Sequence, residues 1–231
     1  MPREWRRPVL CLVTDRRRLA ETLAQPEREA ARLLASQIEG AILGGVDVVQ
    51  VRERDLSARE LSEVVRAAVT AAARSEVAVV VNDRIDVAIA AMSTGVHLRE
   101  DSVGVNTARS LLRARQLLGR SVHDMDGVAA AHGADYLIAG TVFDSPSKQG
   151  GSTRLGLEGL RAVVERAGAC PVWAIGGVTA ERASVIAESG AAGVAAISMF
   201  IPAGCQADLV DTVQELTANL RFSFDSHWRR S

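Results

Sequence analysis

Short apolar runs alternate with longer amphipathic segments along almost the whole chain. The first run, PVLCLV at 8–13, is followed by residues 29–43, in which apolar side chains recur at helical spacing. The same alternation predicts seven further strands, at 46–51, 77–81, 95–98, 120–123, 136–139, 171–175 and 194–198. The predicted helices that follow them cover 57–73, 84–91, 106–118, 125–131, 157–167, a segment that begins at Thr179, and 208–220.

Continuous apolar strands between amphipathic helices are typical of a parallel sheet that helices cover. Eight such units in a chain of 231 residues fit a closed (β/α)8 barrel, the TIM barrel, at the small end of its size range. We therefore predict a single α/β domain over residues 1–231, with its core at about 8–220 and frayed ends that include 222–231. A doubly wound open sheet is the alternative.

Composition and charge exclude several functional classes. The net charge is only −1, with 28 acidic and 27 basic side chains, so the sequence has no electrostatic footprint for nucleic acid or an acidic membrane. The longest uncharged run, 189–207, is broken by glycine and proline, and 8–13 is too short for a signal peptide. Cys11, Cys170 and Cys205 lack any metal or disulfide-motif spacing. We expect a cytoplasmic protein without membrane or nucleic-acid partners.

One basic residue stands out from the others. Of the 27 basic side chains, 26 are arginine and only Lys148 is lysine. A general preference for arginine explains the bias but not the single exception. Lys148 lies in a Gly- and Ser-rich loop at 144–154, after the sixth predicted strand, so it is a candidate site residue.

Polar side chains gather where the predicted strands end, which is where TIM barrels carry their chemistry. Gln50, Arg52 and Arg54 alternate along the second strand and so share one face. Two guanidiniums and an amide on one face suit a phosphate or diphosphate, which they bind through charge-assisted hydrogen bonds. The alternative is a salt-bridged cluster that uses Glu53 and Asp55.

Two carboxylates follow adjacent strands, Asp83 after the third and Asp101 after the fourth. One or two carboxylates beside substrate phosphates suit Mg²⁺. The alternative is that Asp83 caps the helix that begins at Arg84, and that Asp101 caps a turn. The sequence by itself leaves these two interpretations equal.

The last two strands end in a glycine pair that includes Gly177 and in Ile197 and Ser198. Backbone amides at this place in a barrel commonly bind phosphate. Among the four histidines, His97 lies on an apolar strand and is expected to be structural. His123 ends the polar fifth strand and is a candidate general acid or base.

Six motifs, met in this order, resemble the thiamine-phosphate synthase family. They are VQVRER at 49–54, VNDRIDVA at 81–88, GVHL at 95–98, GTVFDSPSK at 140–148, AIGGV at 174–178 and GVAAIS at 193–198. The resemblance covers about residues 9–220. It implies a (β/α)8 barrel whose synthases join a hydroxymethylpyrimidine diphosphate to a thiazole phosphate, giving thiamine phosphate and pyrophosphate.

The resemblance also implies a role for each motif residue. The diphosphate would be held by Gln50, Arg52, Arg54, Asn82 and Lys148, and Mg²⁺ by Asp83 and Asp101. Ser121 would contact the pyrimidine. The thiazole and its phosphate would be held by Ser145, Ser147, Gly177, Ile197 and Ser198. Among these, Lys148, Arg52 and Ser121 would act on the reacting groups, in a dissociative mechanism in which the diphosphate leaves before the thiazole nitrogen attacks.

A second branch of the family, the TenI-type thiazole tautomerases, moves protons on a thiazole phosphate carboxylate with a histidine. Three departures favour it: Arg54 where synthases usually have lysine, Arg99 and Glu100 where they have Gly-Gln, and the phrase GRSVH that ends at His123. Asp83, Asp101 and Lys148 favour the synthase, which we take as the main prediction. A non-catalytic thiazole-phosphate binder is the third hypothesis. All three bind small molecules, and each is compatible with a homo-oligomer.

Overall fold

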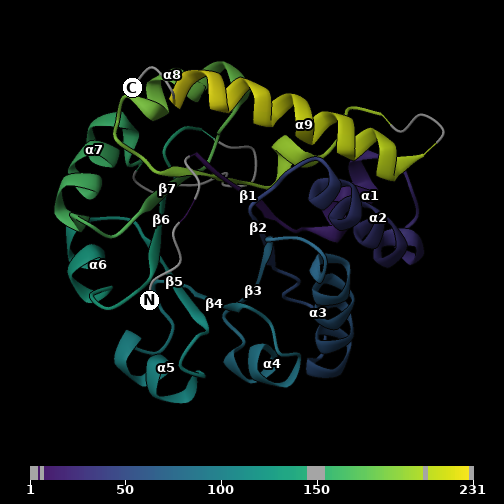
Figure 1. Cartoon of the computed structure of the whole chain (residues 1–231), viewed down its shortest axis with the longest axis horizontal. Helices are drawn as coiled ribbons and strands as arrows, with labels where there is room; N and C mark the ends of the chain where they lie inside the picture. Colours follow the sequence, from purple (N-terminus) through teal and green to yellow (C-terminus); the bar gives the residue numbers. More distant parts are fainter. Residues whose placement is uncertain (1–4, 6–7, 145–153, 205–207, 229–231) are drawn as a thin grey trace.

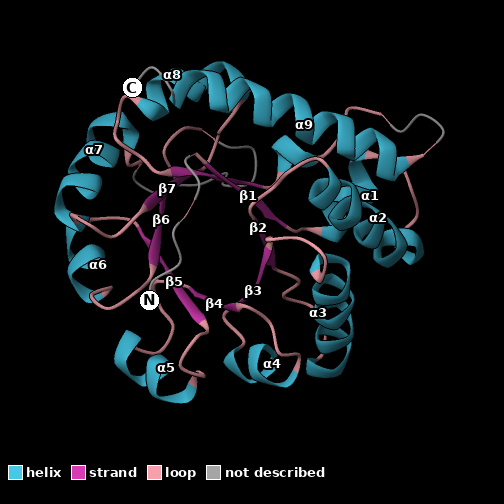
Figure 2. Cartoon of the chain, viewed as in Figure 1, coloured by secondary structure: helices cyan, strands magenta, loops and turns pink. Residues whose placement is uncertain are grey.

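The computed structural model of the chain describes residue 5 and residues 8–144, 154–204 and 208–228. Eight parallel strands close into a barrel in chain order, with β8 paired back to β1 (Figure 1). Helices surround the ring on its outside (Figure 2). The predicted (β/α)8 barrel is therefore confirmed, and the open-sheet alternative is wrong.

The strands are β1 (Val9–Val13), β2 (Val48–Val51), β3 (Ala78–Asn82), β4 (Gly95–Leu98), β5 (Leu117–Val122), β6 (Tyr136–Gly140), β7 (Val172–Ile175) and β8 (Gly193–Ala196). The α-helices are α1 (Arg16–Thr22), α2 (Ala30–Leu43), α3 (Ala58–Ala72), α4 (Ile85–Ala90), α5 (Val105–Leu111), α6 (Met125–Ala130), α7 (Gly156–Ala167), α8 (Ala183–Ala187) and α9 (Leu209–Trp228). Three 3-10 turns complete the described chain, η1 (Glu27–Glu29), η2 (Ala180–Arg182) and η3 (Ser198–Phe200).

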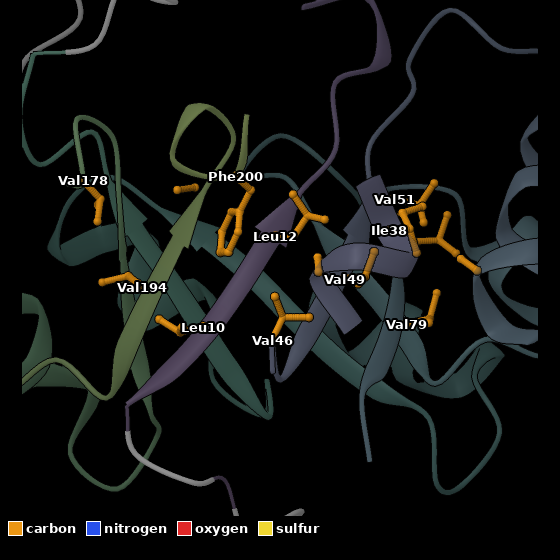
Figure 3. Packing of buried hydrophobic residues seen from close by; sticks show 14 of the residues in the cluster. Leu10, Leu12, Ile38, Val46, Val49, Val51, Val79, Val178, Val194 and Phe200 are labelled. Atoms are coloured by element: carbon orange, nitrogen blue, oxygen red, sulfur yellow. The ribbon is translucent and has the colours of Figure 1, made fainter. Parts of the chain in front are cut away.

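Alternate residues of each strand face two different cores. Leu10 and Leu12 of β1 point outward, where they pack with Phe200 and with the helices (Figure 3). Cys11, between them, points into the barrel with the inward residues of its neighbours. The inward series of β2 passes through Val48 and reaches Gln50, which is therefore placed at the mouth of the barrel.

Aromatic rings fill the amino-terminal end of the barrel. The rings of Tyr136 and Trp173 stack with centroids 4.0 Å apart, and Trp5 meets Trp173 edge-on at 5.2 Å. His97 stacks on the Tyr136 ring at 5.5 Å, one step nearer the mouth. Aromatic pairs of this kind stabilise a protein by more than the burial of their apolar area alone. This column of rings therefore closes the barrel firmly below its open end.

The fifth strand and the helix before it differ from the prediction. The strand was expected at 120–123, but β5 begins at Leu117, and α5 ends at Leu111 instead of 118. The side chain of Gln116 is buried between them and donates to the carbonyls of Ala88 and Ser93. The apolar residues at 117–118 continue the helical spacing of the preceding segment, which is why the predicted helix ran to 118. In the structure they belong to β5.

The expected fraying of residues 222–231 is wrong for 222–228, which continue α9. Phe224 is fully buried, and Trp228 Nε1 donates to the carbonyl of Ala191 at 3.0 Å. Arg221 donates to the carbonyls of Pro8 and Gly45 and so ties α9 to the start of the barrel. Residues 229–231 lie outside the described chain. No helix among the described residues is both long enough and apolar enough to cross a membrane.

Helices α2 and α9 approach each other closely because α2 presents two glycines. A Cβ on Gly40 would lie 2.4 Å from the carbonyl oxygen of Val210, and one on Gly44 would lie 2.5 Å from that of Gln214. No side chain fits in either place. The glycines therefore let the last helix lie directly on the second one, as Figure 1 shows for α9 along one side of the barrel.

Candidate functional site

The carboxyl ends of the strands surround a cavity of about 450 Å³. Its wall brings together most of the predicted site residues: Gln50, Arg52, Arg54, Asn82, Asp101, Ser121, His123, Gly177, Ile197 and Ser198. Asp83 lines a smaller neighbouring cavity of about 150 Å³, which shares Arg54, Asn82 and Arg99 with the first. The predicted residues Ser145, Ser147 and Lys148 lie outside the described chain.

The acidic residues beside the cationic row have a different partner. Arg16 Nη1 lies 3.1 Å from Glu53 Oε2 and 2.6 Å from Asp55 Oδ1. Thr14 Oγ1 also donates to the buried Glu53 carboxylate, at 2.6 Å. The hydrogen bonds from Arg16 lower the pKa of Asp55 to about 2. The expected alternative, a cluster in which Glu53 and Asp55 neutralise the arginines of the row, is therefore wrong.

Arg52 and Arg54 consequently face the cavity with little compensation. The nearest carboxylate to Arg52 is Asp15, at 3.9 Å, and within the described chain Arg54 makes no ion pair. Burial and then the charge of Arg54 lower the pKa of Arg52. Arg18, which is not among the predicted site residues, lines the same cavity from α1. Guanidiniums placed together in this way are stabilised by an anion that carries several charges.

Gln50 and Asn82 link the ends of β2 and β3 at this mouth. Gln50 Nε2 donates to Asn82 Oδ1 at 3.1 Å. Gln50 Oε1 is buried and has no hydrogen-bond partner among the described residues. A buried acceptor without a partner is costly, so a donor group on a bound molecule would stabilise it.

Ser121 is oriented by a neutral histidine. His97 Nε2 lies 2.9 Å from Ser121 Oγ, across the β4–β5 pair. Burial, and then the charge of Arg120, lower the pKa of His97 to about 3, so the ring is uncharged at neutral pH. His97 is enclosed and stacked on Tyr136, which agrees with the structural role expected for it.

His123 lies just beyond β5, which ends at Val122, and not on the strand as predicted. Its Nδ1 contacts the carbonyl oxygen of Gly140, which can only accept, so Nδ1 carries a hydrogen. Nε2 is left to face the cavity, 3.8 Å from Glu100 Oε2. Glu100 was noted in the sequence as a departure from synthases but was not expected to be a site residue.

Asp83 and Asp101 both contact the side chain of Arg99. Arg99 Nη1 lies 3.7 Å from Asp83 Oδ2, and Nη2 contacts Asp101 Oδ2. The Asp83 carboxylate also accepts from Ser102 Oγ, and α4 has no side-chain cap, so the interpretation of Asp83 as a helix cap is wrong. Two carboxylates that converge on one positive charge have the donor chemistry that Mg²⁺ requires.

Any metal here needs ligands from a bound molecule as well. Among the described residues, no group of three or more histidine, cysteine, aspartate or glutamate side chains could hold an ion. Mg²⁺ characteristically uses one or two carboxylates and completes its shell with water and substrate phosphates. The pair Asp83 and Asp101 would fit that pattern if a phosphate-bearing molecule were bound at the neighbouring arginine row.

The opposite rim is built from backbone. Gly176 and Gly177 have φ values of +97° and +61°, and a Cβ on Gly177 would lie 2.4 Å from the carbonyl oxygen of Asp144. Arg182 Nη1 donates to the Gly177 carbonyl at 2.5 Å, while its guanidinium lies 4.4 Å from the ring centroid of Phe143. The turn therefore lies against the 141–144 segment with its backbone toward the cavity.

Known proteins resemble this chain over most of its length. A sequence model of the thiamine monophosphate synthase family matches residues 10–200. A putative thiamine-phosphate synthase of Geobacter sulfurreducens is 39% identical over 194 residues, which are 83% of this chain and 86% of that protein. The thiamine-phosphate synthase of Natronomonas pharaonis is 38% identical over 202 residues, covering 84% of this chain and 94% of its own.

Solved structures give the same result. Thiamine phosphate pyrophosphorylase of Pyrococcus furiosus superposes with a TM-score of 0.77 and 29% identity, covering 95% of this chain and 96% of that one. A KDPGal structure follows at a TM-score of 0.65 and 15% identity, a likeness of fold only. The resemblance found in the motifs is thus confirmed, and the chain belongs to the thiamine monophosphate synthase family.

Proposed function

We propose that this chain joins a hydroxymethylpyrimidine diphosphate to a thiazole phosphate, giving thiamine phosphate and pyrophosphate. The observation that carries the proposal is the arginine row beside the Asp83 and Asp101 pair, in which Arg52 has only Asp15 close by, at 3.9 Å, and Arg54 makes no ion pair among the described residues. Arg52 and Arg54 are available to pair with a ligand because Arg16 forms the ion pairs with the neighbouring carboxylates of Glu53 and Asp55. Relatives across 83–84% of the chain are named for this activity.

The side chains of the cavity would stabilise the charge that develops on the leaving group. In the reaction, the bond between the pyrimidine methylene carbon and the diphosphate oxygen breaks, and its electron pair leaves with pyrophosphate. The thiazole nitrogen then gives its lone pair to that carbon. Arg52, Arg54 and Asn82 would hold the diphosphate, while Gln50 offers its buried carbonyl oxygen to a donor on the same substrate.

Asp83 and Asp101 would hold Mg²⁺ together with the diphosphate oxygens. When bound, this ion supplies positive charge that neutralises the departing pyrophosphate. Ser121, fixed by His97, would contact the pyrimidine ring. The backbone at Gly177, Ile197 and Ser198 would hold the thiazole phosphate. Lys148, Ser145 and Ser147 keep the roles that the family resemblance implies for them.

The test is direct. Purified protein with both substrates and Mg²⁺ should form thiamine phosphate and pyrophosphate, measured by chromatography. Arg52→Ala should slow the reaction by about 100-fold, since charge-assisted hydrogen bonds to a transition state contribute about 1.5–3 kcal/mol each. Arg59→Ala, on the exposed face of α3, is the matched control. No product at high enzyme concentration would overturn the proposal.

The geometry of His123 favours a second candidate, thiazole tautomerisation. The ring is held through Nδ1 and presents Nε2 to the cavity beside Glu100. A group that takes a proton from one carbon and returns it to another needs such a fixed ring with one nitrogen free for the proton. An NMR assay of the thiazole phosphate carboxylate should then lose about 10²–10⁴-fold in rate in His123→Ala. Both assays on one preparation separate the candidates, and a non-catalytic binder would fail both.

A further inference from the structure

Arg99 bridges the two carboxylates proposed to hold a metal. Its two terminal nitrogens contact Oδ2 of Asp83 and Oδ2 of Asp101. Ser102 closes the network, because its Oγ accepts from the Arg99 backbone N–H at 3.0 Å and donates to Asp83. A divalent ion that uses the same two oxygens must first displace the guanidinium.

The side chain of Arg99 has a second position within reach, near the arginine row. This side chain is 40% exposed and forms part of the wall of both cavities, so it has open space beside it into which it can turn. It also stands near the arginine row, where its charge contributes to lowering the pKa of Arg52, after burial and Arg54. A diphosphate in the row would offer the guanidinium a paired set of oxygens, a better partner than two separate carboxylates.

We propose that Arg99 is an internal counter-cation that competes with divalent metal for Asp83 and Asp101, and that an organic diphosphate draws it away. The free protein then binds metal weakly, and the metal site is completed only when the diphosphate arrives. The identity of the diphosphate rests on the proposed function. The competition itself is a property of the free protein.

The first test measures Mn²⁺, as a paramagnetic substitute for Mg²⁺, bound to the substrate-free protein by electron paramagnetic resonance. Arg99→Gln should tighten Mn²⁺ binding by about fivefold, the order expected for the loss of partly exposed ion pairs. Arg99→Lys, which keeps the charge, should remain as weak as the wild type. Adding Asp101→Asn to Arg99→Gln should abolish the gain.

The control for general charge is Arg84→Gln, which removes a guanidinium that pairs with Asp86 close to Asp83. It should leave Mn²⁺ affinity within twofold of the wild type. Equal affinity in wild type and Arg99→Gln, or an equal gain in Arg84→Gln, overturns the competition. Circular dichroism of each variant verifies that the barrel is intact.

The second test concerns the release of Arg99. Inorganic pyrophosphate is titrated calorimetrically in the presence of a chelator, so that no metal ion contributes to its binding. Arg99→Gln should weaken this binding by about fivefold, because one of the cations that moves to the diphosphate is gone. Unchanged pyrophosphate affinity overturns the release. Neither measurement uses turnover, so failure of the synthase assay leaves both results interpretable.

Discussion

Arg16 lies 3.1 Å from the buried carboxylate of Glu53, although 37 residues separate them in the chain. This pair decides the electrostatics of the whole mouth. If Glu53 were free, it could pair with Arg52 or Arg54, which follow β2 beside it, and would reduce the positive charge of the cavity. By pairing with Glu53, Arg16 preserves the positive charge of the cavity, although Arg16 is not one of the residues that line it.

Arg16→Ala should therefore be strongly destabilising. It leaves the Glu53 side chain, only 3% exposed, without its charged partner, and the loss of one partner of a buried pair typically costs about 3–5 kcal/mol. Urea denaturation measures the free energy of unfolding. Arg17→Ala, which removes an exposed guanidinium from the same turn, should cost less than about 1 kcal/mol. Similar losses in the two variants would contradict this account.

His97 should give the protein a measurable pH dependence. Its pKa falls from 6.5 to about 3 on folding, so between these values the unfolded chain binds more protons than the folded one. The free energy of unfolding must then decrease as the pH falls below 6.5, by up to about 1.4 kcal/mol per pH unit from this group. Urea titrations at pH 7.5 and pH 5 should show a smaller difference in His97→Gln. His132→Gln, at the surface, controls for the loss of a histidine.

Gly40→Ala should weaken the contact between α2 and α9. Alanine gains up to about 1 kcal/mol in helix propensity, but its Cβ meets the Val210 carbonyl at 2.4 Å, and overpacking typically costs about 1–3 kcal/mol. Because the neighbour is backbone, we expect the packing term to dominate and thermal unfolding to begin at lower temperature. Gly204→Ala, where a Cβ meets open space, is the control. A more stable Gly40→Ala would show that α9 moves freely.

Gly177→Ala should impair the phosphate end of the cavity selectively. The residue has φ of +61°, and its Cβ would meet the Asp144 carbonyl at 2.4 Å, so the turn must shift. Steady-state kinetics should show KM for the thiazole phosphate raised more than tenfold, with KM for the pyrimidine diphosphate nearly unchanged. A rise in both constants would place Gly177 outside a dedicated thiazole-phosphate subsite.

The barrel was predictable because its strands are continuous apolar runs and its helices are amphipathic. Gln50, Arg52 and Arg54 line one cavity as predicted, but β2 ends at Val51, so strand alternation accounts for Gln50 and not for the two arginines beyond the strand. The pairing of Arg16 with Glu53 was not predictable, because nothing in the sequence says which of several arginines reaches a given carboxylate. Arg18 was missed because α1 is short and a run of three arginines looks like an exposed surface.

Arg99 illustrates a different limit. In the sequence it is only a departure from the family pattern, and its significance depends on two carboxylates from different strands meeting at its tip. The helix that continues past Leu220 was missed for a related reason. Its apolar contacts, Phe224 and Trp228, lie among polar residues, and only the barrel beneath gives them partners.

The aromatic column has a practical consequence for every binding experiment. Trp5 and Trp173 form its lower end, Tyr136 stacks on Trp173, and His97 connects Tyr136 to the hydroxyl of Ser121 at the mouth. A molecule that rotates that hydroxyl should disturb His97 and, through the stacked Tyr136 ring, the indole of Trp173. The barrel therefore contains its own fluorophore, and we expect tryptophan emission to change when a molecule occupies the cavity, without any added label.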